Sequence, residues 1–306
     1  MRIAHVSDLH LLPQQKIPFH RLLNKRITGY INLRFRRKRA HRLVLLEATL
    51  QALKTASPDH LVITGDLTNL ALESEFEHAY QFLQSHLALN PDQISIVPGN
   101  HDSYTRRSFQ EKRFFHYFKE YLHSDSPLQL HPISHPFPFL HLRQGIAFIG
   151  LSSAVACPPL IAKGRIGNRQ LEAMSLLLQQ KEVQKRIPVL LLHHPPYPPP
   201  QPTKAWLAGL EDANKLMSRL DRVAHGIILH GHLHSRQHQI HPTQTGLLHV
   251  LGTTSASLDH PDDKKRAGFN MYELSEEGTI KKIETYILQQ NPTLFHVKPL
   301  LPGAFS

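Results

Sequence analysis

Residues 94–102 read ISIVPGNHD, and this stretch decides the fold of the chain. Its first half is a short apolar run, rich in isoleucine and valine, that is typical of a buried strand. Its second half places Gly99, Asn100, His101 and Asp102 directly behind that strand. Such a tetrapeptide can form an ordinary turn, or it can mark a sheet edge where side chains do chemistry. The choice depends on whether other apolar runs in the chain end in the same way.

Short apolar runs recur along the chain and alternate with segments of helical spacing. Residues 75–87 and 169–180 carry apolar side chains at three- and four-residue steps, which predicts two helices. Two strand-like runs flank Ser275–Gly278, which predicts a hairpin near the end of the chain. Strands alternating with helices indicate an α/β fold. The other predicted strands are residues 3–6, 60–64, 94–97, 146–151, 189–192, 226–230 and 247–252.

Five of these apolar runs end in residues that can bind a metal. In open α/β sheets, ligands gather outside the carboxyl ends of the strands, so side chains far apart in sequence converge there. Each motif alone is weak, because an aspartate or histidine behind a strand is usually part of a turn. Their joint appearance is not explained by composition. In chain order the residues are Asp8 and His10, Asp66, Asn100 with His101, His193, and His232 with His234.

The chemistry of this set predicts a dinuclear metal site. Carboxylate, amide and imidazole ligands without a thiolate suit divalent Mn, Fe, Zn, Co or Ni. Seven ligands are too many for one four-coordinate zinc. They suit two ions about 3.5–4 Å apart that share one carboxylate. Such a pair can activate a water between the ions and clamp two oxygens of a phosphoryl group.

At this point the chain closely resembles the calcineurin-like metallophosphoesterase superfamily. The resemblance rests on five intact blocks and runs from residue 1 to about residue 290. It implies a four-layer α/β/β/α sandwich of two mixed sheets with the metals at one rim. The phrases SDLHL and HHPP look most like a bacterial branch that includes cyclic-nucleotide and glycerophosphodiester phosphodiesterases. The blocks are Asp8-Leu9-His10, Gly65-Asp66, Gly99-Asn100-His101-Asp102, His193 and Gly231-His232-Leu233-His234.

The resemblance also implies a role for each site residue. His193 is preferred to His194 as a ligand because the family ligand directly follows the strand, which leaves His194 beside the pocket. His101 would face the scissile phosphate, stabilise developing charge and protonate the leaving oxygen. Asp102 would orient the His101 imidazole, and the alternative for Asp102 is a simple helix cap. One metal would be held by Asp8, His10, Asp66 and His234, and the second by Asp66, Asn100, His193 and His232, with Asp66 as the bridge.

Composition limits where the protein works. The chain has 306 residues and a single cysteine, which excludes an intrachain disulfide and fits a reducing compartment. No signal-peptide pattern and no run long enough to span a membrane is present. We therefore expect a cytoplasmic protein. We expect one metallophosphoesterase domain over residues 1–290, with a basic amphipathic insertion at 18–42, and a C-terminal tail over 291–306.

The insertion at residues 18–42 carries the charge of the protein. Ten basic residues lie between Lys16 and Arg42, against a formal net charge of +11, and no acidic residue occurs between Asp8 and Glu47. Peripheral contact with an anionic membrane at its inner face is one interpretation. Contact with nucleic acid phosphates is a second, and a helix packed on the domain with a solvated basic face is a third. An apolar helix face favours lipid, and it is expected to contain Phe19, Leu22, Leu23, Ile27, Tyr30 and Ile31.

Together these features predict a metal-dependent phosphohydrolase that holds two divalent ions, with Mn, Fe or Zn as the leading candidates. The expected substrate is a phosphodiester or pyrophosphate in a phosphate-containing small molecule or lipid. A cyclic-nucleotide phosphodiesterase and a UDP-2,3-diacylglucosamine pyrophosphohydrolase are the alternatives. A nuclease is less favoured, because no aromatic-rich basic groove is evident. A non-enzymatic scaffold has no reason to keep seven ligands.

Overall fold

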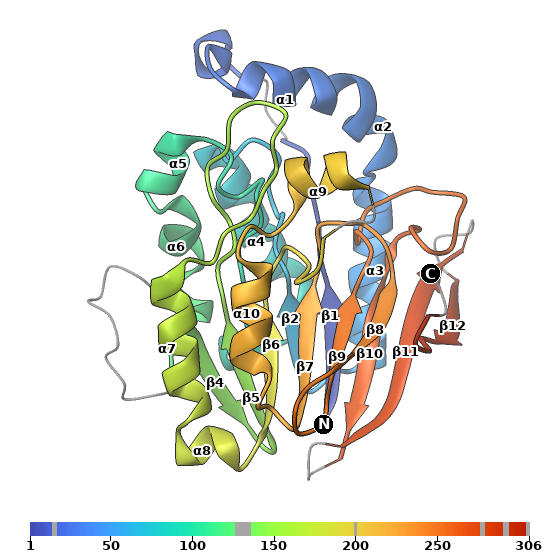
Figure 1. Cartoon of the computed structure of the whole chain (residues 1–306). Coiled ribbons are helices and arrows are strands. Elements are labelled where there is room, and N and C mark those ends of the chain that lie inside the picture. Colours follow the sequence, from blue (N-terminus) through green and yellow to red (C-terminus); the bar gives the residue numbers. More distant parts are fainter. Residues whose placement is uncertain (14–16, 126–135, 199–200, 276–278, 290–293, 304–306) are drawn as a thin grey trace.

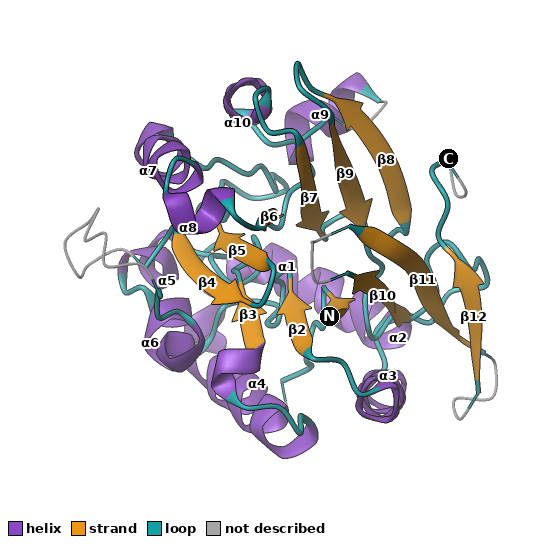
Figure 2. Cartoon of the chain, turned by 90° about the horizontal axis from the view of Figure 1, so that it is seen from below, coloured by secondary structure: helices purple, strands orange, loops and turns teal. Residues whose placement is uncertain are grey.

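A computed structural model of the chain describes residues 1–13, 17–125, 136–198, 201–275, 279–289 and 294–303, with only the backbone of Arg36 and Lys38. Two six-stranded mixed sheets form its centre (Figures 1 and 2). The first sheet has the order β12-β11-β10-β1-β2-β3. Its strands are β1 (Arg2–Val6), β2 (His60–Ile63), β3 (Ile94–Ile96), β10 (Gly268–Leu274), β11 (Ile280–Leu288) and β12 (Phe295–Pro299).

The second sheet has the order β4-β5-β6-β7-β9-β8. Its four central strands are parallel, and an antiparallel strand closes each edge. Parallel strands buried on both faces explain the continuous apolar runs of the sequence. The strands are β4 (Phe139–Arg143), β5 (Ile146–Gly150), β6 (Ile187–Leu191), β7 (His225–His230), β8 (Gln237–Pro242) and β9 (Leu247–Gly252).

Helices cover the outer face of each sheet, which completes the four layers that the sequence predicted. Alternate side chains of β6 and the residue after it show how the layers are built. Val189 and Leu191 join the core between the sheets, whereas Leu190 and Leu192 join a second core under the helices. On the first sheet lie α3 (Leu43–Ala56) and α4 (Glu73–His86), with α5 (Arg106–Gln110) and α6 (Arg113–Phe118) beside them; on the second lie α7 (Asn168–Leu178), α8 (Lys181–Gln184) and α10 (Ala213–Leu220).

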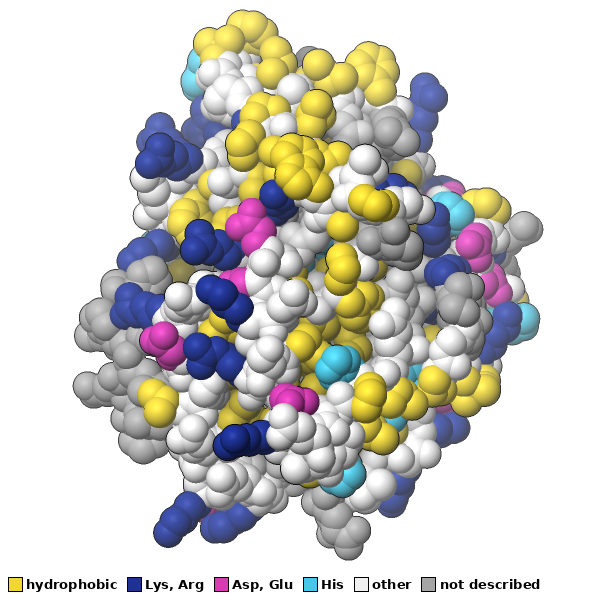
Figure 3. Space-filling view, viewed as in Figure 1, with side chains coloured by type: hydrophobic (Ala, Val, Ile, Leu, Met, Phe, Trp, Pro, Cys, Tyr) yellow, Lys and Arg dark blue, Asp and Glu magenta, His cyan; other side chains and the backbone are white. Residues whose placement is uncertain are grey.

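The basic insertion forms a broken helical cover over one end of the sheets (Figure 1). It was expected to be a basic amphipathic helix followed by an arginine cluster, and in the structure a turn and a stretch of π-helix interrupt the helical segment. Hydrophobic side chains gather on this end of the molecule (Figure 3). The insertion consists of a 3₁₀ turn (Phe19–Leu22), α1 (Arg26–Asn32), the π-helix (Leu33–Arg37) and α2 (Lys38–Ala40); other short helices are α9 (Pro202–Ala208) and the 3₁₀ turns Pro91–Gln93 and Lys119–Tyr121.

The C-terminal residues differ from the expected tail. Residues 295–299 form β12, which pairs antiparallel with β11 at the edge of the first sheet. Leu300 follows it and is buried in the core between the sheets and helices. Residues 295–300 are therefore part of the sheet sandwich. The backbone N–H and C=O groups of β12 find their hydrogen-bond partners on β11.

Candidate metal centre

All five predicted strand ends meet at one rim of the molecule. Loops after β1, β2 and β3 bring residues from the first sheet, and loops after β6 and β7 bring residues from the second. The centre therefore lies where the two sheets face each other, and neither sheet alone could build it. The side chains that converge are Asp8, His10, Asp66, Asn100, His193, His232 and His234.

The first group of ligands consists of Asp8, His10 and His234. Nε2 of His234 lies 3.0 Å from Oδ1 of Asp8 and 3.2 Å from Nε2 of His10. Nε2 of His10 lies 3.8 Å from the same Asp8 oxygen. These atoms surround a space of the size that one ion needs.

The second group consists of Asn100, His193 and His232. Oδ1 of Asn100 lies 3.1 Å from Nε2 of His193 and 3.0 Å from Nδ1 of His232. The two imidazole nitrogens are 3.3 Å apart. An amide oxygen and two imidazoles at this spacing form a second candidate position.

Asp66 joins the two groups. Its Oδ2 lies 3.8 Å from Nε2 of His10 and 3.4 Å from Nε2 of His193. Burial alone would raise the pKa of Asp66, but His193 and His101 beside it hold that pKa well below its usual value. A buried carboxylate kept ionised between two sets of imidazoles is suited to bridge two cations.

Backbone carbonyls fix which nitrogen each histidine presents. Nδ1 of His10 donates to Thr68 O at 3.3 Å, and Nδ1 of His193 donates to Thr64 O at 2.7 Å, so both present Nε2. Nε2 of His232 donates to Ala208 O at 3.0 Å, so this residue presents Nδ1. Such bonds are usual for metal-binding histidines because they set the tautomer and the ring orientation.

Two features test whether the residues fit metal ions. Oδ1 of Asp8 is buried and accepts no hydrogen bond, although Nε2 of His234 is near. Nε2 of His10, whose proton sits on Nδ1, lies 3.2 Å from Nε2 of His234, and the same His234 nitrogen lies 3.0 Å from Oδ1 of Asp8, so one imidazole proton cannot serve both acceptors. Buried acceptors that face one another are costly unless a cation lies between them. The residues therefore fit a pair of metal ions.

The backbone of the ligand loops is strained. Asp8, His10, Asp66, His232 and His234 all have positive φ values, between 46° and 68°. A side chain in this region costs of order 1–3 kcal/mol, and such strain gathers at functional sites. Five of the seven ligands thus adopt a conformation that folding alone would not favour.

Two glycines allow the loops to approach each other. A Cβ on Gly99 would lie 2.2 Å from Oδ1 of Asp66, and a Cβ on Gly231 would lie 1.9 Å from Oγ of Ser7 and 2.6 Å from Oδ2 of Asp8. Glycine is required here because the backbone packs directly against the ligands. Backbone N–H groups of the same loops donate to the carboxylates, from His101 to Asp66 at 2.7 Å and from His232 to Asp8 at 3.1 Å.

His101 lies beside the metal positions without joining either ligand group. Its Nδ1 donates to Asn69 O at 2.7 Å, which leaves Nε2 free to accept an N–H of Arg37 at 2.7 Å. Burial and the Arg37 charge lower the pKa of His101 to about 3. Its imidazole is therefore neutral and held at the mouth of the centre.

Asp102 has a different environment from the one expected. Its carboxylate accepts the backbone N–H groups of Gly99 at 2.9 Å, Thr68 at 3.0 Å and Leu67 at 3.3 Å. The partner of the His101 imidazole is Asn69 O instead, so Asp102 does not orient that ring. Asp102 ties the loop after β2 to the loop after β3, and these loops carry Asp66 and Asn100. Burial and the Asp66 charge raise the pKa of Asp102 to about 7.

Sequence reasoning missed two residues, both from the insertion. The guanidinium of Arg37 lies 3.2 Å from Nδ1 of His10 as well as next to His101. His41 packs its ring 4.6 Å from that of His10 and, with His10 and His234, forms a trio that could hold a metal ion. Both lie in a segment that was expected to be a lid or surface helix beside the metal rim, and no motif distinguishes them from the other basic residues.

His194 lies behind the centre, as expected. Its Nδ1 lies 2.8 Å from Oγ of Ser153, and its Nε2 lies 3.0 Å from Ala162 O. Its ring packs 5.1 Å from that of His193 and 4.4 Å from that of His232. It therefore supports the second ligand group and is not part of it.

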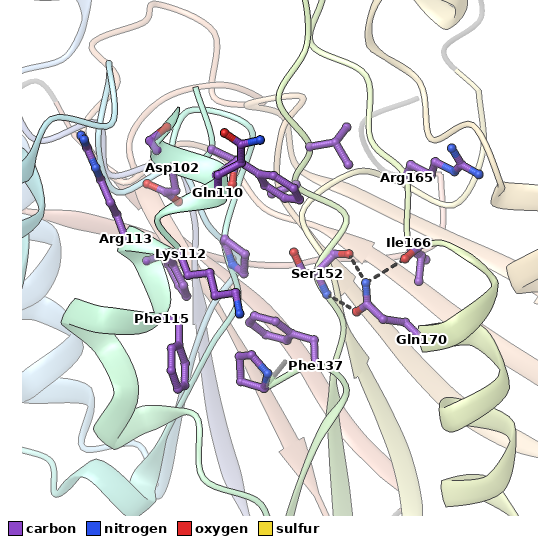
Figure 4. Close-up of a pocket in the computed structure, with 18 of the residues that line it drawn as sticks. Asp102, Gln110, Lys112, Arg113, Phe115, Phe137, Ser152, Arg165, Ile166 and Gln170 are labelled. Carbon is purple, nitrogen blue, oxygen red and sulfur yellow. Dashed lines mark hydrogen bonds between the residues drawn. The ribbon is translucent and has the colours of Figure 1, made fainter. Parts of the chain in front are cut away.

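Two cavities lie next to the centre. A groove of about 490 Å³ is lined by His101 and Arg37 and, among other polar and apolar residues, by Ile31, Phe35 and Leu160. A separate cavity of about 360 Å³ lies behind the loop of Asp102 (Figure 4). Four phenylalanines line this second cavity together with polar and charged side chains, and Gln170 on one side is hydrogen-bonded to Ser152 and Ile166. Of the predicted site residues, which are all described, only Asp102 lines it.

The fold is shared with known phosphatases. A dimetal phosphatase from Danio rerio is 11% identical, with a TM-score of 0.51 over 98% of this chain and 99% of that chain. The purple acid phosphatase PPD1 from yellow lupin (Lupinus luteus) seeds is 12% identical, with a TM-score of 0.59 over 97% of this chain and 52% of that chain. At this identity the likeness concerns the fold alone. No curated protein sequence matches the chain.

The family follows from the sequence itself. The family model described as calcineurin-like phosphoesterase matches residues 1–236, which is most of the chain and includes all seven candidate ligands. The chain belongs to this family and is a metallophosphoesterase, a hydrolase of phosphoric esters. Among the described residues no helix is both long and apolar enough to cross a membrane.

Proposed function

We propose that this protein hydrolyses a phosphodiester or pyrophosphate bond with two divalent metal ions. The position of Asp66 carries the proposal, because one of its carboxylate oxygens lies between the two ligand groups. When bound, the ions would activate water and neutralise phosphoryl oxygens. Asp8, His10 and His234 would hold one ion, Asn100, His193 and His232 the other, and Asp66 both.

The groups at the mouth of the centre would bind the phosphate. Arg37 presents a guanidinium whose planar fork matches phosphate oxygens. An incoming phosphate would accept the N–H that Arg37 now donates to Nε2 of His101. His101 would then face the phosphate through Nε2. The negative charge of the bound phosphate would favour a proton on this nitrogen, and the imidazolium so formed could stabilise charge and pass that proton to the leaving oxygen.

We further propose a lipid-linked substrate in preference to a nucleotide. The groove that Arg37 and His101 line is also lined by the apolar side chains Ile31, Phe35 and Leu160. Phe35 and Leu160 are 67% and 84% exposed, so the groove opens onto an apolar surface. An acyl chain could follow it, whereas a cyclic nucleotide has no need of an apolar exit.

One assay series tests both proposals. Metal-free protein would be reconstituted separately with Mn, Fe and Zn, and metal bound per chain measured by elemental analysis. Activity would be measured with bis(p-nitrophenyl) phosphate, cyclic nucleotides, glycerophosphodiesters and UDP-2,3-diacylglucosamine. We expect up to two ions per chain and turnover only with metal. Full activity after complete chelation would disprove the metal mechanism, and faster turnover of cyclic nucleotides than of the lipid-linked substrate would disprove the substrate preference.

A further inference from the structure

The outer face of the insertion is unusual because it is apolar. Phe19, Leu23, Ile27, Ile31 and Phe35 follow one another at four-residue steps, and they are 71%, 66%, 44%, 52% and 67% exposed. Ile27 and Ile31 share one face of α1, and Phe19, Leu23 and Phe35 are exposed in the turns and the π-helix on either side of it. A helix that covers a protein normally turns its apolar face inward, so this stripe has no partner in the described chain.

The inner face of the same segment is already satisfied. Leu22 and Leu33 are buried in the main core. Arg26 is buried and donates to Leu70 O at 2.8 Å and Ala71 O at 3.0 Å. The insertion is therefore fixed to the domain through one face, and turning it over to hide the stripe would break these bonds. The predicted apolar face was wrong in this respect, since Leu22 points inward.

Two further segments extend the apolar surface around the groove. Leu160 is 84% exposed, and it lines the groove together with Ile31 and Phe35. Trp206 of α9 is 61% exposed, and α9 is joined to the loop of Leu160 by the hydrogen bond from Ala162 N to Leu207 O at 2.8 Å. Figure 3 shows the hydrophobic side chains gathered at this end of the molecule. Large exposed apolar patches of this kind mark interaction sites.

The positive charge around the apolar patch indicates which kind of partner the patch would bind. Arg34 and Arg39 of the insertion and Lys204 of α9 are exposed beside it. No acidic residue occurs between Asp8 and Glu47, so the insertion supplies no negative charge of its own. Apolar side chains bordered by cations match the boundary between headgroups and acyl chains of an anionic bilayer. Nucleic acid would be attracted by the cations but would leave the apolar stripe exposed to water.

We propose that this surface, formed by residues 19–39, the loop of Leu160 and α9, docks on an anionic phospholipid bilayer. Docking would place the open end of the groove against the lipid. This orientation rests on the proposed function, in which the groove receives the lipid part of the substrate. The docking itself rests only on the exposed side chains and their charge.

The chain provides its own probe of docking. Trp206 is the only tryptophan of the protein, so tryptophan emission, excited selectively over the tyrosines, reports this surface alone. Vesicles of phosphatidylcholine with and without phosphatidylglycerol would be added to wild-type protein. We expect a blue shift and protection from acrylamide quenching with the anionic vesicles, reversed at high salt because screening shortens the range of the charges. An unchanged spectrum at low salt would overturn the proposal.

Co-sedimentation with the same vesicles identifies the residues. Phe19→Ser/Leu23→Ser/Ile27→Ser and Arg34→Gln/Arg39→Gln/Lys204→Gln should each weaken binding about tenfold or more. The matched controls, Leu176→Ser/Ile240→Ser/Val297→Ser and Lys119→Gln/Lys181→Gln/Lys281→Gln, change exposed residues elsewhere and should bind like wild type. Equal losses in variants and controls would overturn the proposal. So would binding of DNA, but not of vesicles, by the wild-type protein.

The same samples separate docking from catalysis. Hydrolysis of bis(p-nitrophenyl) phosphate, a small soluble diester, should be unchanged in all four variants, because none of the substituted residues belongs to the metal centre. Vesicle binding by a protein without diesterase activity would contradict the proposed function and leave docking standing. Diesterase activity without vesicle binding would contradict docking alone.

Discussion

Nη2 of Arg37 lies 2.7 Å from Nε2 of His101, which brings the basic insertion into the metal centre. The segment thus has two chemical faces. Its outer face presents the apolar stripe, and its inner face presents Arg37 and His41 to the ligands. Burial lowers the pKa of Arg37, and the charges of Asp66 and other acidic groups raise it. The negative charge of the centre therefore stabilises the buried guanidinium in its charged form. We thus propose that cations of the insertion bind phosphate at the centre and also face the bilayer.

Replacing Arg37 should impair turnover but not metal binding. Arg37→Ala is expected to lower kcat for a soluble diester by about 10²–10³, the range for loss of a donor that stabilises the transition state. Arg37→Lys should recover only part of the rate, because lysine lacks the planar fork. Steady-state kinetics and elemental analysis would be run together. Arg34→Ala, whose side chain is exposed, is the control, and loss of metal in Arg37→Ala would show that the residue supports the site and does not bind phosphate.

His101 and Asp66 should separate catalysis from metal binding. His101 lies outside both ligand groups, so His101→Ala should retain metal and lose most of its turnover. Asp66 lies between the groups, so Asp66→Ala should lose both ions or bind them weakly and independently. Metal titration and kinetics on each variant check this. Equal loss of metal in the two variants would disprove the assigned roles.

Asp102 should affect the metals through the backbone. Its carboxylate accepts three backbone N–H groups from the loops that carry Asp66 and Asn100. Asp102→Ala is therefore expected to weaken metal binding by roughly 10–100-fold, the usual range for residues that support ligands. At saturating metal much of the activity should return. A large fall in kcat with unchanged metal affinity would instead indicate that Asp102 acts on the orientation of the His101 imidazole.

The sequence was sufficient to predict the strands that carry the ligands. Residues such as 60–64 and 226–230 are buried on both faces, so their apolar runs are continuous and easily recognised. The edge strands β8 and β12 were missed for the opposite reason. In β8, which reads QHQIHP, and in β12, polar residues face solvent and the apolar signal disappears. The proline-rich stretch 126–138 was expected to be a loop, but most of it lies outside the described residues.

The insertion marks the limit of sequence reasoning at the site. Its composition correctly suggested a special segment, but composition does not say which arginine turns inward. Arg26 donates to the carbonyls of Leu70 and Ala71, and the negative charge of the centre stabilises Arg37. These partners lie far from the insertion in sequence. The convergence of the candidate metal ligands was predictable because each follows a recognisable strand. Residues that the insertion adds to the site do not follow a recognisable strand, so no local sequence pattern identifies them.

His41 should contribute to the first metal position. Its Nδ1 lies 2.9 Å from Oγ of Ser257, and its ring faces His10 and His234. We expect His41→Ala to weaken one of the two binding steps by about 10–100-fold and to leave the other unchanged. Titration with cobalt, followed by visible absorption, resolves the two steps. His20→Ala, exposed on the same segment, is the control, and two unchanged steps would show that His41 only packs against the ligands.

Glu75 should make folding stability depend on pH. It is buried at the start of α4, and its Oε2 accepts the N–H groups of Leu70 and Leu72, both at 3.0 Å, in the turn that anchors Arg26. Burial raises the pKa of Glu75 from 4.5 to about 6. Between these values the native protein keeps a proton that the unfolded chain has released, so stability falls as pH rises through this window. The loss should be complete above pH 6 and amount to about 2 kcal/mol.

Denaturant unfolding of wild type and Glu75→Gln across this pH range isolates the effect, because the amide cannot titrate. Any constant offset caused by the amide leaves the pH slope untouched. The stability advantage of wild type over Glu75→Gln should therefore shrink by about 2 kcal/mol between pH 4 and pH 7. Glu77→Gln, two residues further along the same helix and exposed, should follow the wild-type curve. Parallel curves for wild type and Glu75→Gln would mean that Glu75 has the same pKa in the folded and unfolded chain.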